Sequence, residues 1–251
     1  MKNSRTFGFD FKDTRQLLLL FALATCLWGF VELAETVMAG GTSSVDEALL
    51  LMLRNDADLT DPIGPMWVEE MMRDITALGS VGVLTLVTLL AVGFLLLEHK
   101  RRLALLVIVA IGSGMLASFF LKYGFSRPRP DLVPHGSYTY TSSFPSGHSM
   151  LSALVYFTLA SLLAQVQYKK RIKAYLYTIA IILTVMIGIS RVYLGVHWPT
   201  DVLAGWVAGI FWALIFLLVT KRLQKQGKIE HQGVEPELQE AEVQVSAQPQ
   251  L

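Results

Sequence analysis

The chain has 251 residues, of which 53% are hydrophobic and 16% are charged, with a formal net charge of +1. Because soluble domains usually carry about 25% charged residues, this composition indicates a membrane protein, and no basic cluster interleaved with aromatic residues points to a nucleic-acid partner. The single cysteine, Cys26, excludes an intrachain disulfide and a cysteine-based metal site.

Six apolar stretches are long enough to cross a bilayer, which takes about 20 residues. They are residues 16–36, 78–97, 103–121, 149–166, 174–194 and 202–220. Charged residues within them are confined to Glu32, Glu35 and Arg191, each close to the end of its stretch. The sequence therefore predicts an all-α bundle of six transmembrane helices, forming one domain over residues 1–226.

Basic residues mark one side of this bundle. They cluster before the first span, between the second and third, between the fourth and fifth, and after the sixth. These four clusters hold 15 of the 21 Lys and Arg residues. Basic loops stay in the cytoplasm, so we expect both termini inside and the remaining loops outside.

Two polar segments flank the spans. Residues 42–77, on the outer side, read as two short amphipathic helices, one over 45–54 and one opening at Pro65. The second helix either lies at the membrane surface or packs over the bundle. Residues 227–251 are polar and rich in Gln and Glu, which is typical of a disordered tail.

Three polar clusters fall on the expected outer side. The first runs from Lys122 to Arg129 and Pro130, and the second is Pro145-Ser146-Gly147-His148. The third runs from Ser190 and Arg191 to His197 and Asp201. Lys122, Arg129 and Arg191 are cations at a depth where charge is costly unless it is paired, solvated or functional.

The second and third clusters each contain a histidine beside a predicted helix start. Ser146 is a candidate N-cap, and the amides after it, next to the small Gly147, form a potential anion site. Pro199 favours a helix start that puts Asp201 in the first turn, within reach of His197. Such an aspartate fixes the tautomer of the imidazole and makes the other ring nitrogen a better nucleophile.

The three clusters resemble the type 2 phosphatidic acid phosphatase superfamily. Its pattern is Lys-x6-Arg-Pro, then Pro-Ser-Gly-His, then Ser-Arg-x5-His-x3-Asp, and this sequence fills every defining position. The resemblance implies that His197, oriented by Asp201, attacks phosphorus and that His148 protonates the leaving oxygen. It further implies a phosphate-binding set made of Lys122, Arg129, Arg191, Ser146, Gly147 and Ser190.

The same resemblance leads us to expect a bacterial inner-membrane enzyme whose partner is a lipid phosphate. Cations and helix amides neutralise the phosphoryl group, so we predict no cofactor and no metal. Undecaprenyl diphosphate is the first substrate candidate, with phosphatidylglycerophosphate or phosphatidate as the alternative. A lipid phosphotransferase and a non-enzymatic membrane protein are rival classes, and the sequence leaves the oligomeric state open.

Two further residues near the first cluster have open roles in the sequence. Arg127 and His135 either contact substrate or face solvent, and Arg127 has Asp131 as a nearby partner. Tyr138, Tyr140 and Phe144 form an interfacial aromatic lip or pack locally.

Overall fold

The computed structural model describes residues 14–133, 141–165 and 167–229, which form helices and one small hairpin. In chain order the elements are α1 (Thr14–Met38), α2 (Ser43–Leu51), β1 (Arg54–Asn55), β2 (Asp58–Pro62), α3 (Met66–Ala77), α4 (Val81–Leu97), α5 (Arg101–Gly124), α6 (Gly147–Gln165), α7 (Lys170–Tyr193) and α8 (Pro199–Lys225). The antiparallel β1–β2 pair was not predicted, because its short and polar strands lack the alternation that marks a strand.

Five helices of the described chain have the length and apolar character to cross a membrane, namely α1, α5, α6, α7 and α8. Helices α3 and α4 meet at a 49° bend and would count as a sixth span only as a pair. By itself α4 has 17 residues, which rise about 26 Å against a hydrocarbon core of about 30 Å. The helical membrane-spanning architecture is confirmed, while a count of six depends on this bent pair.

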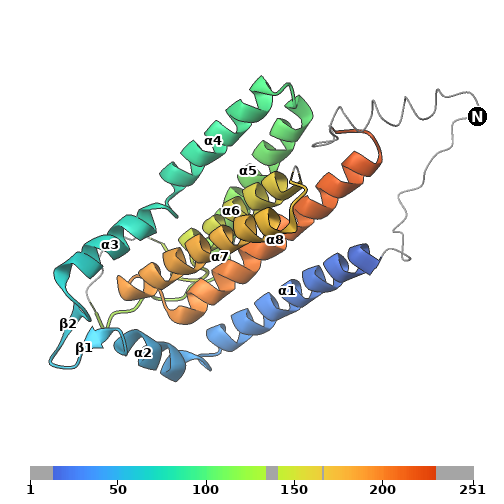
Figure 1. The fold of residues 1–251 in the computed structure, drawn as a ribbon. Coiled ribbons are helices and arrows are strands. Elements are labelled where there is room, and N and C mark those ends of the chain that lie inside the picture. The colour runs from blue at the N-terminus through green and yellow to red at the C-terminus, as the bar shows by residue number, and fades with distance from the viewer. Residues whose placement is uncertain (1–13, 134–140, 166, 230–251) are drawn as a thin grey trace, which may run out of the picture.

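Helix α6 lies at the centre, in contact with α4, α5, α7 and α8, while α1 runs along the outside of α8 (Figure 1). Helix α8 comes close to the start of α6. A Cβ atom on Gly205 would lie 2.6 Å from the carbonyl oxygen of Ser146, and one on Gly209 would lie 2.3 Å from that of Met150. Small residues four apart allow such backbone proximity between membrane helices, and here they press the second motif against the start of α8.

One end of the bundle is covered by α2, the hairpin and α3 (Figure 1). The two predicted amphipathic helices correspond to α2 and α3, although α2 ends at Leu51. Val68 and Met72 of α3 pack against a buried cluster at the end of α7, whereas Trp67 is 62% exposed. Helix α3 therefore covers the bundle with one face and leaves Trp67 outside.

The α4–α5 connection and the end of α8 lie at the opposite end of the bundle (Figure 1). There Arg102 donates a hydrogen bond of 2.8 Å to the carbonyl oxygen of Lys228, and Ile229 is buried in the main apolar core. Most of the predicted tail, residues 230–251, lies outside the described residues.

Candidate active site

The three motifs meet at one cavity of about 430 Å³ near the covered end of the bundle. Helix α5 and the segment after it supply Lys122 and Arg129, α6 supplies His148, and α7 with the loop after it supplies Arg191 and His197. The rest of the described lining is mostly apolar or small: Gly79, Val81, Met115, Ser118, Phe119, Thr141, Gly147 and Leu151. Two histidines and three cations that lie up to 75 positions apart along the chain, from Lys122 to His197, thus come together.

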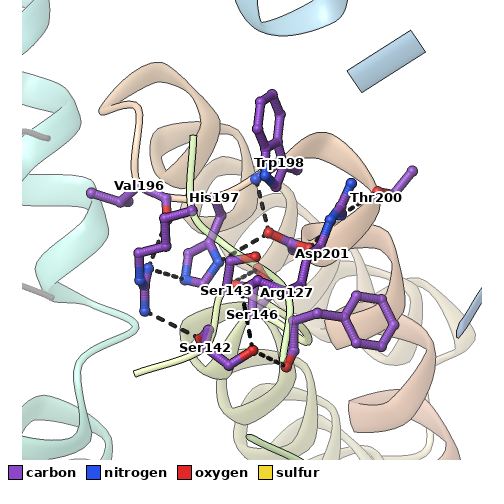
Figure 2. A network of polar contacts seen from close by, with 12 residues as sticks. Arg127, Ser142, Ser143, Ser146, Val196, His197, Trp198, Thr200 and Asp201 are labelled. Atoms are coloured by element: carbon purple, nitrogen blue, oxygen red, sulfur yellow. Dashed lines mark hydrogen bonds and ion pairs between the residues drawn. The ribbon is translucent and has the colours of Figure 1, made fainter. Parts of the chain in front are cut away.

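His197 sits in the loop between α7 and α8 and is only 2% exposed. Its Nδ1 lies 3.4 Å from Oδ2 of Asp201, and its Nε2 lies 3.3 Å from Nη1 of Arg129 (Figure 2). Helix α8 begins at Pro199, as the sequence predicts, so Asp201 occupies its first turn. The arrangement favours a proton on Nδ1 facing the carboxylate, which leaves the Nε2 lone pair facing the cavity.

Burial lowers the pKa of the His197 imidazole to about 4, against the opposing effect of Asp201. Arg191 and Arg129 lower the same pKa through charge repulsion. The imidazole is therefore neutral at physiological pH, which is the form that can act as a nucleophile.

Lys122, Arg129 and Arg191 form no ion pair with a carboxylate within the described part of the chain. Lys122 donates to Thr141 Oγ1 at 3.2 Å, Arg129 donates to the carbonyl oxygen of Val196 at 2.7 Å, and Arg191 donates to Thr76 Oγ1 at 3.0 Å. Nε of Arg191 is buried without a hydrogen-bond partner among the described residues. Three cations whose partners among the described residues are all neutral groups surround one cavity, and they form a site for an anion with several oxygens.

The start of α6 carries the second motif to the cavity. Gly147 and His148 line it, and a Cβ on Gly147 would lie 3.4 Å from Cε of Lys122, so the glycine keeps the space beneath that lysine free. The amide of Ser146 donates to the backbone oxygen of Asp201 at 3.0 Å. This bond ties the second motif directly to the third.

Two predicted phosphate-binding residues do not belong to the cavity lining. Ser146 is fully buried, and its hydroxyl accepts a bond from the Ser149 hydroxyl at 3.0 Å. Ser190 is also fully buried, and its hydroxyl donates to the backbone oxygen of Ile187 at 2.6 Å. Both hydroxyls are used within helix ends, so these serines stabilise the elements that carry the site.

Two ion pairs of Arg127, on the side of His197 away from the cavity, were not expected from the sequence. Arg127 contacts Asp201 on one side and Asp46 of α2 on the other, at 2.6 Å each. The suggested partner Asp131 is instead exposed. No sequence signal pointed to the contact with Asp46, because that residue lies 81 positions from Arg127.

The aromatic residues between the first two motifs are only partly described. Phe144 is fully buried and packs with Phe30 and Phe125, at ring centroid distances of 6.0 and 5.0 Å, so it forms no interfacial lip. His135, Tyr138 and Tyr140 lie outside the described residues. Within the described chain, no three His, Cys, Asp or Glu side chains gather as metal ligands would.

Comparison with known proteins places this site in a family. Residues 103–225 match the PAP2 superfamily. The chain is 36% identical over 194 residues to phosphatidylglycerophosphatase B of Bacillus subtilis (strain 168), a match that covers 76% of this chain and 89% of that protein. It is 28% identical over 120 residues to undecaprenyl-diphosphatase of Sulfolobus acidocaldarius, covering 46% of this chain and 54% of that protein.

A solved structure supports the same assignment. The crystal structure of a transmembrane PAP2 type phosphatidylglycerolphosphate phosphatase from Bacillus subtilis superposes with a TM-score of 0.72 and 30% sequence identity. The match covers 81% of this chain and 98% of that chain. The chain belongs to the PAP2 superfamily and is a membrane-embedded lipid phosphatase of that family.

Proposed function

We propose that this protein hydrolyses a phosphate from a membrane lipid through a phosphohistidine on His197, without a metal ion. One observation carries the proposal: Nε2 of a neutral, buried histidine faces a cavity whose three cations have no carboxylate partner among the described residues. Phosphoryl transfer depends mainly on positioning and on neutralising the phosphoryl oxygens, and this cavity is built for both.

The two steps of the reaction use the two histidines in turn. Nε2 of His197 forms a bond to phosphorus while the bond from phosphorus to the lipid oxygen breaks, and His148 gives a proton to that oxygen. His148 then takes a proton from water, whose oxygen bonds to phosphorus as the bond to Nε2 breaks. The products are the dephosphorylated lipid and inorganic phosphate, and both histidines return to their initial state.

The relatives support phosphatidylglycerophosphate as the first substrate to test. The relative named for that lipid is matched at higher identity, and over more of its length, than the one named undecaprenyl-diphosphatase. This reverses the order expected from the sequence, in which undecaprenyl diphosphate came first. The apolar lining residues Met115, Phe119 and Leu151 suit a lipid next to its phosphate.

The basic residues support an outward-facing site in the bacterial inner membrane. The basic α4–α5 connection and the end of α8 lie opposite the end covered by α2 and α3 (Figure 1). In a Cys26→Ser background, we expect a membrane-impermeant maleimide to label Asp56→Cys in intact cells and to leave Glu98→Cys unlabelled. Both residues are exposed, so the opposite labelling pattern would invert the topology.

The decisive assay compares phosphate release by the purified full-length protein from phosphatidylglycerophosphate, undecaprenyl diphosphate and phosphatidate, with and without EDTA. We expect release from at least one lipid, unaffected by EDTA and absent in His197→Ala. Brief incubation with a 32P-labelled substrate should give an acid-labile protein phosphate in the wild type that His197→Ala lacks. Release that requires an added acceptor would identify a phosphotransferase, and activity in His197→Ala would overturn the nucleophile assignment.

A further inference from the structure

The rear of the nucleophile is built around one buried arginine. The Arg127 guanidinium lies between Asp46 and Asp201, 2.6 Å from an oxygen of each, and its side chain is only 10% exposed. It also donates to Thr200 Oγ1 at 2.8 Å and lies 5.6 Å from the ring centroid of Trp198. Both terminal nitrogens are therefore already engaged by the protein, and Arg127 is absent from the lining of the cavity with the two histidines.

Asp46 contacts the start of α8, its own loop and Arg127. Its Oδ1 accepts a bond from the Thr200 amide at 2.9 Å, and its Oδ2 accepts from the hydroxyls of Thr200 at 2.7 Å and Thr42 at 2.9 Å, besides Arg127. The carboxylate is fully buried. Burying a charge this well requires a complete set of partners, and Asp46 has one.

Asp201 is fixed from three directions by these contacts. Arg127 holds Oδ1, the amide of Trp198 holds Oδ2 at 2.9 Å, and the amide of Ser146 holds the backbone oxygen (Figure 2). The one interaction left for Oδ2 is with Nδ1 of His197. Rotation of the Asp201 carboxylate, which would withdraw Oδ2 from the imidazole, would break the bonds to Arg127 and Trp198.

We propose that Arg127 and Asp46 are positioning residues, which act through Asp201 to hold His197 in line for attack and to balance the positive charge that develops on its ring. This inference rests on the proposed role of His197. Two carboxylates and one guanidinium leave one negative charge behind the imidazole. That charge stabilises the imidazole as it gives its lone pair to phosphorus, in the same way that a buried aspartate supports a catalytic histidine elsewhere.

If the proposal is right, the acid limb of kcat/KM should respond differently in Arg127→Met and in Asp46→Asn. Arg127→Met removes a positive charge near Asp201 and so should raise the pKa of His197, which shifts the acid limb of kcat/KM to higher pH by about one unit. Asp46→Asn removes a negative charge, so its acid limb should not move to higher pH. The other charged or titratable groups facing His197 are unchanged in both variants: Asp201 of α8, Arg191 of α7, His148 of α6, Lys122 of α5 and Arg129.

The test measures kcat, KM, the acid limb and orthovanadate inhibition for the purified full-length variants. We expect kcat to fall about 100-fold in Arg127→Met and about 10-fold in Asp46→Asn, with KM and the vanadate inhibition constant within threefold of wild type. The double variant should be no worse than Arg127→Met, because the two residues act as one unit. Asp58→Asn, an exposed carboxylate on β2, is the matched control and should behave as wild type.

Arg127→Lys keeps the experiment decisive where Arg127→Met fails to fold. Lysine retains the charge but lacks the fork that joins two carboxylates, so kcat should fall while the acid limb stays in place. A tenfold rise in KM and in the vanadate inhibition constant would instead make Arg127 a phosphate ligand and overturn the proposal. Unchanged kcat in Arg127→Lys and Asp46→Asn, with His197→Gln inactive, would also overturn it, whereas activity in His197→Gln would remove the proposed function first.

Discussion

The two sides of His197 differ in how their cations are balanced. On the cavity side, Lys122, Arg129 and Arg191 bond only to neutral groups among the described residues, whereas on the rear side Arg127 lies between two carboxylates. Arg127 and Arg129 are two positions apart in one Arg-Pro-Arg-Pro segment, so residue type and local context alone do not separate them. Their partners distinguish them. A cation without a carboxylate partner can bind an anionic ligand, whereas a cation already paired with two carboxylates serves to hold the structure together.

Substitution of His197, which lies between the two sides, should give the largest loss of activity. His197→Gln removes the proposed nucleophile and should lower kcat by about 10⁴-fold or more, measured as phosphate release. Orthovanadate should still bind, because the cavity cations remain. His99→Asn is the control: this exposed residue has a φ of 57°, which asparagine tolerates, and it lies at the other end of the bundle. Comparable loss in the control would show that the effect is general.

Removing one arginine from each side should lower activity in both variants but lower stability clearly in only one. Arg129→Gln should lower kcat/KM by about 10²- to 10³-fold, as for loss of a donor to the transition state, and leave the Tm within about 2 °C. Arg127→Met should lower the Tm clearly, because it strands two buried carboxylates at a cost of about 3–5 kcal/mol. Tryptophan fluorescence during heating measures the Tm of both variants. Equal losses of Tm would contradict the proposed difference between the two sides.

The pH dependence should report the neutral state of His197. Its lowered pKa, about 4, means that protonation of His197 adds an acid limb to kcat/KM, corrected for substrate ionisation followed by 31P NMR, only as the pH falls toward about 4. The folded pKa lies below the unfolded value of about 6.5, so this residue's contribution to stability is complete above pH 6.5 and is lost as the pH falls toward 4. A corrected limb with its midpoint near 6.5 would contradict the burial.

The smallest expected effect concerns the floor of the cavity. Gly147→Ala places a Cβ at ordinary contact distance, 3.4 Å from Cε of Lys122 and 3.6 Å from Oγ of Ser118. The fold should survive, and crowding beneath the lysine should lower kcat/KM about three- to tenfold, roughly 1 kcal/mol. Gly82→Ala, where the added atom would meet nothing within 4 Å, should be silent. No change in Gly147→Ala would mean that phosphate does not approach α6 closely.

The cavity side could be predicted from the sequence because its parts are local. Hydropathy located the spans, Pro199 set the start of α8, and the spacing of four put Asp201 beside His197. Lys122, His148 and Arg191 each lie at the end of a span, Arg129 follows α5, and the topology brought these residues together. The three motifs and their resemblance to a known family were sufficient to select these residues.

The rear side could not be predicted, because its contacts join distant segments. In sequence Asp46 is an ordinary acidic residue in the first turn of an amphipathic helix, and only the tertiary fold shows it buried against Thr200 and Arg127. The motif positions also did not reveal that local hydrogen bonds use the hydroxyls of Ser146 and Ser190, whose role in phosphate binding stays a prediction. The bend between α3 and α4 also left no pattern that a hydropathy window detects.

The contact between Asp46 and Thr200 has a consequence for the order of events during synthesis. These residues are separated by 154 positions, so the ribosome finishes α2 long before it makes the start of α8. Until α8 inserts, Asp46 lacks the Thr200 donors and Arg127 lacks Asp201. The proposed nucleophile and its support are thus completed together when α8 is added, and a chain that stops before α8 lacks the contacts that align His197.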